Sequence, residues 1–115
     1  MPMVVRAFPV LPGKEEDVRC LAMEIAGPRR EEASEFYRRF GVEHESWHLQ
    51  QTDHGPWVIA ITEISGHPEK TGAAYAASEL PFEAWFKKEV LRITGIDPAR
   101  EPLGPPTETL LDWRG

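Results

Sequence analysis

Two segments with the character of β-strands, residues 42–52 and 57–64, lie on either side of the tetrapeptide Asp-His-Gly-Pro at 53–56. The second segment, WVIAITEI, is a short run of β-branched and other apolar residues. Runs of this kind bounded by turn-forming residues are typical of strands. Glycine and proline at the break favour a reversal of the chain. The sequence therefore predicts an antiparallel β-hairpin, and the rest of the chain has to cover at least one of its faces.

Helical periodicity precedes this hairpin. After a first strand at residues 3–8, apolar residues recur at helical spacing from about residue 15 to a Gly-Pro stop at 27–28. Acidic residues fill the first turn of this helix, where the helix dipole favours them. A second stretch of helical spacing runs from 28 to a glycine at 41, so we expect two consecutive helices here.

A second helical region follows the hairpin. We expect a short helix within residues 73–78 and a longer one from about 81 to the glycine at 95. Residues 97–106 hold four prolines and a glycine, a composition typical of an extended connector. A final strand is expected at 107–113. The resulting order, βαββαβ with extra helical segments, is that of a ferredoxin-like α+β fold with an antiparallel sheet.

The length of 115 residues, with 41% hydrophobic residues, predicts one domain over residues 1–115. A domain this small buries only about two thirds of the surface that its unfolded chain exposes. Contact with a second copy would add buried surface, so we expect a homodimer.

Several classes of partner and location are disfavoured. The net charge of −6 argues against a nucleic-acid-binding surface, which needs clustered Lys and Arg. The single cysteine, Cys20, permits no intrachain disulfide and fits a cytoplasmic protein. Arg6, Pro9 and Pro12 interrupt the apolar N-terminal stretch, so we expect no signal peptide and no membrane span.

Three segments carry a resemblance to a known group of proteins. They are PGKEE at residues 12–16, the stretch from Gly-Val at 41–42 to Glu-Ser-Trp at 45–47, and FEAWFK at 82–87. Together with the order of the elements, they make the chain similar to the dimeric α+β barrel superfamily and to an uncharacterised bacterial family within it. This resemblance implies that two ferredoxin-like subunits pack their sheets together and enclose a cavity.

The resemblance also implies a range of activities. Members of the superfamily include cofactor-independent monooxygenases, haem-dependent and haem-degrading enzymes, lactone isomerases and small proteins without known activity. Their active-site residues differ from branch to branch, so no set of residues is carried over to this chain. The resemblance therefore bears on the fold more than on the function.

The segment His44-Glu45-Ser46-Trp47-His48 matches the letters of the zinc-peptidase motif H-E-x-x-H. That motif binds zinc because a helix places both histidines on one face, one turn apart. This segment follows a glycine stop and precedes a hairpin turn, so we expect a strand. On a strand, residues four apart lie about 13 Å from each other, too far for one ion to bridge. A zinc hydrolase is the alternative if the segment is helical, and we expect no metal or cofactor otherwise.

The alternation of side chains between the two faces of this strand suggests a candidate catalytic site. Glu45 would face one side of the sheet and His48 the other. If the turn at 53–56 placed Ser46 opposite Glu63, then Ser46, His48 and Glu63 would share a face. We take His48, Glu45 and Glu63 as candidate catalytic residues, because histidine and carboxylates transfer protons near neutral pH. A wet sheet surface, or hydrogen bonds across a dimer, would equally explain these polar groups.

Further side chains are candidates for ligand binding, namely Trp47, Ser46, His44, Tyr37 and Trp85. Tryptophans on strands can form a wall of an apolar pocket, although tryptophan more often anchors a core or an interface. The leading hypothesis is a homodimer whose cavity binds a small apolar or aromatic molecule, with a monooxygenase-like or isomerase-like reaction as one outcome. The alternative is a non-enzymatic binding or assembly module. The residues leave open whether the chain is an enzyme.

Overall fold

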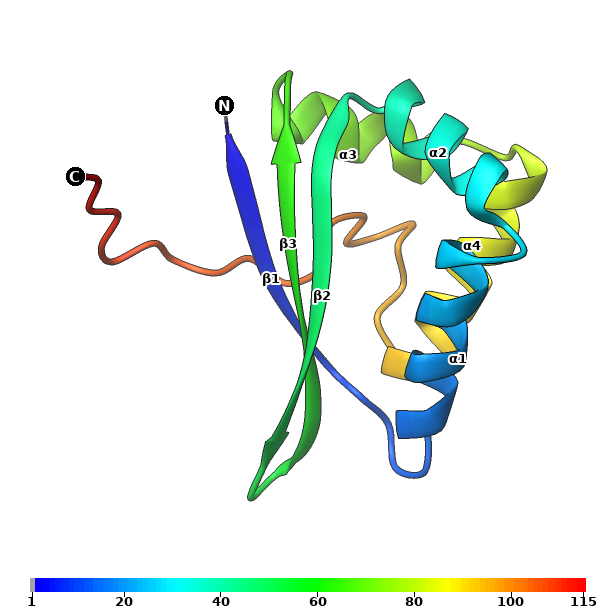
Figure 1. Cartoon of the computed structure of the whole chain (residues 1–115), viewed down its shortest axis with the longest axis vertical. Helices are drawn as coiled ribbons and strands as arrows, with labels where there is room; N and C mark the ends of the chain where they lie inside the picture. The colour runs from blue at the N-terminus through cyan, green and yellow to red at the C-terminus, as the bar shows by residue number, and fades with distance from the viewer. Residues whose placement is uncertain (1) are drawn as a thin grey trace.

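Three antiparallel strands and four helices form the part of the protein that the computed structural model describes, residues 2–115 (Figure 1). None of these helices is long and apolar enough to cross a membrane. The elements, in chain order, are β1 (Met3–Pro9), α1 (Glu15–Ala26), α2 (Arg30–Arg39), β2 (Val42–Thr52), β3 (Gly55–Ile64), α3 (Pro68–Ala77) and α4 (Pro81–Thr94).

The sheet has the order β1-β3-β2, so β3 lies in the centre and pairs with both neighbours. The predicted hairpin is confirmed: β2 and β3 are antiparallel and joined by a tight turn in which Thr52 pairs with Gly55. This turn is shorter than we assumed, and Ser46 therefore lies opposite Ile61, not opposite Glu63. The displacement is two residues, an even number, so each side chain still points to the expected face.

A β-bulge interrupts β2 at its start. The pairing shifts between Val42 and His44, which leaves Glu43 out of the regular alternation. Val42 consequently faces the same side of the sheet as Glu45, although the two residues are three apart. The alternation of side chains that we expected along residues 42–52 is therefore interrupted at Glu43, which is exposed.

All four helices cover one face of the sheet (Figure 1). The core forms between these layers, and its centre is Phe36 of α2. The ring centroid of Phe36 lies 5.0 Å from that of Phe82 and 5.7 Å from those of Tyr75 and Phe86. These three residues belong to α3 and α4, so a single side chain ties three helices together.

The ends of the second pair of helices follow from local chemistry. Pro81 occupies the first turn of α4, where its missing N–H is no loss. Gly95 ends the helix in the left-handed conformation, with φ +76°, and its N–H donates to Leu91 O at 2.8 Å. Helix α3 begins at Pro68, well before the expected residue 73, because proline can open a helix as well as end one.

The last expected strand, residues 107–113, does not form in the structure. A single β-bridge joins Arg6 to Pro106, and the Thr107 hydroxyl donates to Val5 O at 2.5 Å. Pro105 and Pro106 have no N–H and therefore donate no backbone hydrogen bond to β1, which limits the pairing at this edge. The structure shows an α+β fold with a three-stranded sheet, and the complete βαββαβ order is absent from residues 2–115.

A buried ion pair fixes α2 against α4. The carboxylate of Glu83 is fully buried and accepts hydrogen bonds from Arg39 Nη2 at 2.8 Å and from Ser78 Oγ at 2.6 Å. Arg39 remains partly exposed to solvent. Removing one partner of such a pair leaves the remaining polar groups without their bonds, which costs more than the net gain from the pair itself.

We therefore expect Glu83→Ala to lower the free energy of unfolding by about 2–3 kcal/mol. The matched control, Glu35→Ala at an exposed position of α2, should change it by less than about 0.5 kcal/mol. Urea denaturation followed by circular dichroism measures both. Equal stabilities for the two variants would contradict a structural role for the Glu83 ion pair.

Candidate functional site

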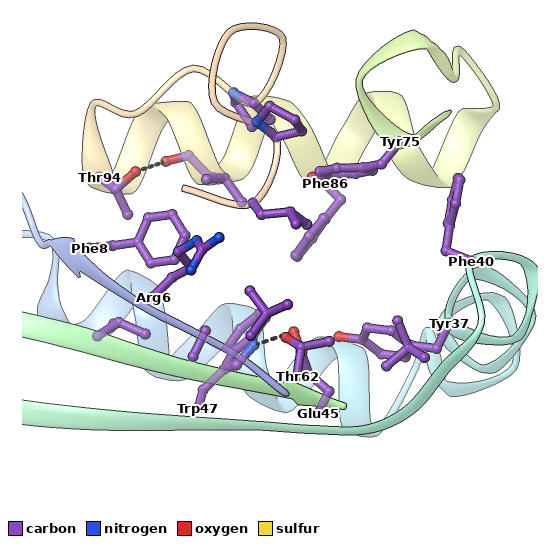
Figure 2. Close-up of a pocket in the computed structure, with 18 of the residues that line it drawn as sticks. Arg6, Phe8, Tyr37, Phe40, Glu45, Trp47, Thr62, Tyr75, Phe86 and Thr94 are labelled. Carbon is purple, nitrogen blue, oxygen red and sulfur yellow. Dashed lines mark hydrogen bonds between the residues drawn. The ribbon is translucent and has the colours of Figure 1, made fainter. Parts of the chain in front are cut away.

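A cavity of about 140 Å³ lies between the sheet and the helices (Figure 2). Its lining is mostly apolar and comes from all three strands, all four helices and the connector after α4. A few polar side chains interrupt this lining: Arg6, Tyr37, Glu45, Thr62, Thr71, Tyr75, Thr94 and Glu101. An apolar hollow with a small number of convergent polar groups is the usual form of a small-molecule site.

The connector closes one side of the cavity, and two glycines make this possible. At Gly72 of α3 a Cβ atom would lie 3.3 Å from Pro102. At Gly104, which has φ +85°, a Cβ atom would collide with the ring of Phe8. Pro102 and Phe8 both line the cavity. Close approach of the backbone at these two glycines therefore brings the connector against α3 and β1.

Glu45 is the most deeply placed carboxyl group of the lining. Its two oxygens accept separate hydrogen bonds, one from the Thr62 hydroxyl and one from Trp47 Nε1 at 3.0 Å. The Trp47 ring stacks on Phe86, with 6.0 Å between the ring centroids. Burial raises the pKa of Glu45, and the two hydrogen bonds oppose this shift in part. The carboxyl is thus held in a fixed position in surroundings that favour its protonated form.

Two tyrosines, Tyr37 and Tyr75, also line the cavity (Figure 2). Burial raises the pKa of both phenols, and the negative charge of Glu45 raises it further. Their hydroxyl groups therefore stay protonated over the physiological pH range and can donate hydrogen bonds to a ligand.

Three of the residues proposed from the sequence meet at this cavity: Glu45, Trp47 and Tyr37. Trp85 is placed elsewhere. Its ring packs against Phe82, and the guanidinium of Arg29 lies 3.9 Å from its centroid. Trp85 is absent from the cavity lining in the described part of the chain, and its contacts are those of a helix-packing residue.

The other four candidates, His44, Ser46, His48 and Glu63, lie on the opposite face of the sheet from Glu45. His48 Nε2 and Ser46 Oγ are 3.1 Å apart, and Glu63 pairs with His44 across the strands. The sheet separates this surface group from the cavity. Consequently His48 and Glu45 are not brought together as partners in one acid–base site.

The zinc-peptidase alternative depended on a helical His44-Glu45-x-x-His48 segment. The segment lies within β2, as expected, with Glu45 on one face of the sheet and both histidines on the other. A glutamate on the far side of the sheet cannot activate a water bound between these histidines. The helix on which the zinc hydrolase alternative depends does not form in this segment.

Sequence reasoning missed several lining residues, above all Arg6, Thr62 and Tyr75. The sequence did indicate that Arg6 faces the core. Val4, Arg6 and Phe8 are two residues apart, so on a strand their side chains point to the same face of the sheet. Tyr75 had none, since the start of α3 was misplaced. Comparison of the chain with models of protein families, with curated proteins and with solved structures finds no match.

The position of Glu45 predicts a pH-dependent stability. The pKa of Glu45 is raised in the folded protein. The protonated side chain therefore contributes its full stabilisation below the pKa of glutamate in the unfolded chain, about 4.3. This stabilisation is lost as the pH rises through the pKa of Glu45 in the folded protein. We expect Glu45→Gln to gain stability relative to the wild type as the pH rises through this window. Urea denaturation at a series of pH values measures the difference.

The matched control for this experiment is Glu35→Gln on the exposed side of α2. Its stability relative to the wild type should show no comparable rise with pH. If the difference between Glu45→Gln and the wild type stayed constant across the series, burial of an ionisable Glu45 would be contradicted.

Proposed function

We propose that the protein binds a small, largely apolar or aromatic molecule in the cavity between its sheet and its helices. The observation that carries this proposal is the apolar hollow beside the fixed carboxyl of Glu45 and the two tyrosines. A dry cavity of about 150 Å³ in another protein admits benzene, so a hollow of 140 Å³ suits a ligand of about one ring. A purely structural module would have no need of such a space.

The polar groups of the cavity favour one kind of reaction over another. Of the monooxygenase-like and isomerase-like chemistries expected from the resemblance, the isomerase-like reaction is the one that these groups serve directly. Glu45 in its ionised form would take a proton from one carbon of the ligand and return it to another. A hydroxyl of Tyr37 or Tyr75 would donate a hydrogen bond to the oxygen on which negative charge develops.

We further propose that two copies pair through the face of the sheet that the helices leave uncovered. In the register of the sheet, Val5 lies beside Ile61 and Ala7 beside Ile59, which forms an apolar strip across two strands. The C-terminal residues extend toward this side of the sheet (Figure 1). There Leu110, Leu111 and Trp113 are about four-fifths exposed, a state that contact with a second copy would relieve.

This pairing is how a ferredoxin-like fold and a dimeric α+β barrel would arise from the structure. The sheet order β1-β3-β2 leaves the outer edge of β1 for a fourth strand, and Pro106 already forms a bridge there. The central pairings and the helices on one face support this proposal. The cavity and the dimer surface lie on opposite faces of the sheet, so the two functions can be tested separately.

Filling the cavity should abolish binding. Ala60 lines the hollow from β3, and we expect Ala60→Leu to weaken the binding of toluene roughly tenfold or more. Chemical-shift changes in a two-dimensional ¹⁵N–¹H NMR titration measure the affinity. The matched control, Ala74→Leu on the exposed side of α3, should bind toluene as the wild type does. Failure of the wild type to bind toluene would count against the apolar cavity as a ligand site.

The dimer proposal predicts a mass in solution of twice the 13.0 kDa of one chain. Ile61→Lys places like charges in the centre of the proposed interface, so this variant should have the mass of the monomer. Leu91→Lys, at an exposed position on α4, should remain dimeric. Light scattering after size-exclusion chromatography measures all three masses. A monomeric wild type would overturn this part of the proposal.

A further inference from the structure

Arg6 is a cation whose position the fold itself does not explain. It faces the core from β1, opposite Ala60 and between the apolar residues Val4 and Phe8 (Figure 2). Within the described chain its side chain makes one hydrogen bond, from Nη1 to Val5 O at 3.0 Å. Its Nε is buried and has no hydrogen-bond partner there. Burial lowers the pKa of Arg6, but an arginine stays charged at neutral pH.

Arg6 as a whole is partly exposed, but its Nε is withdrawn from water, and a charged group in such a position normally has an anionic partner because losing hydration is costly. Glu45 and Glu101 also line the cavity. Glu45 is committed to Thr62 and Trp47, and no ion pair between Arg6 and an acidic group occurs in residues 2–115. The guanidinium edge formed by Nε and Nη2 therefore has no protein acceptor.

That edge has the geometry for one kind of ligand group. The Nε–H and Nη2–H bonds of an arginine point in the same direction and fit the two oxygens of a carboxylate. Arg6 also lines a second recess, shared with residues 67–70 at the start of α3. Lys70 adds a positive charge to this recess and Glu69 a negative one. The guanidinium thus lies where the apolar cavity and a polar recess approach each other.

We propose that the ligand of the cavity is an aromatic monocarboxylate of about one ring, whose carboxylate pairs with the free Nε–Nη2 edge of Arg6. This inference rests on the proposed function of the cavity and adds the chemical class of the ligand. The ring lies against the apolar lining that includes Phe8 and Phe86. The carboxylate of the ligand balances the positive charge of Arg6, which has no acidic partner among residues 2–115.

Benzoate and benzamide test this assignment, since they are nearly the same in shape and differ in charge. We expect the wild type to bind benzoate at least about tenfold more tightly than benzamide, the range of a charged hydrogen-bonded pair. Arg6→Met should lose this preference while its affinity for benzamide stays within about twofold. Arg6→Lys keeps the charge without the two-donor edge and should lose part of the preference. Titrations followed by ¹⁵N–¹H NMR measure each affinity.

The matched control is Arg38→Met, which removes one exposed cation from α2 and leaves the cavity intact. It should keep the full preference for benzoate. Equal binding of benzoate and benzamide by the wild type, or an equal loss of preference in Arg38→Met, would overturn the role of Arg6 and leave the apolar site standing. Absence of binding for toluene, benzoate and benzamide alike would overturn the proposed function and this inference with it. The comparison within the wild type decides the matter even if Arg6→Met fails to fold.

Discussion

Packing of aromatic rings around Phe36 is the interaction on which the helical layer depends. Phe36 contacts the rings of its own helix and those of α3 and α4, and it is almost fully buried. Such rings contribute large buried areas and prefer tilted or offset contacts, which limit how the helices can shift. Tyr75 and Phe86 belong both to this cluster and to the lining of the cavity. The same packing that holds the helices together therefore determines the shape of the site.

The polar groups of the cavity differ in how far the protein itself satisfies their hydrogen bonds. Glu45 has both oxygens engaged, so it is positioned before any ligand arrives. The tyrosines remain donors because burial disfavours their ionised forms. Arg6 keeps one edge of its guanidinium without an acceptor. In the site that we propose, one fixed carboxyl, neutral donors and a cation with one edge lacking an acceptor would distinguish ligands by charge as well as by size.

Some of this could be predicted from the sequence, and the physical reasons are particular to each residue. The hairpin and the strand around Trp47 followed from the turn residues and from alternation, both local signals. The bulge at Glu43 and the pairing of Ser46 depend on how two strands meet, which no local pattern specifies. The final strand failed because Pro105 and Pro106 outweigh the apolar residues that follow them. Arg6 was overlooked although its position in an alternating strand marked it as facing the core.

The single bridge between Arg6 and Pro106 has a consequence for how the protein behaves at high concentration. An unprotected outer strand is a template on which other chains can add without limit, the first step toward fibrils. Pro106 pairs with Arg6 at this edge and so covers part of β1. Proline has no backbone N–H to donate to a strand of another chain. Pro105 and Pro106 thus oppose open-ended growth of the sheet along this edge.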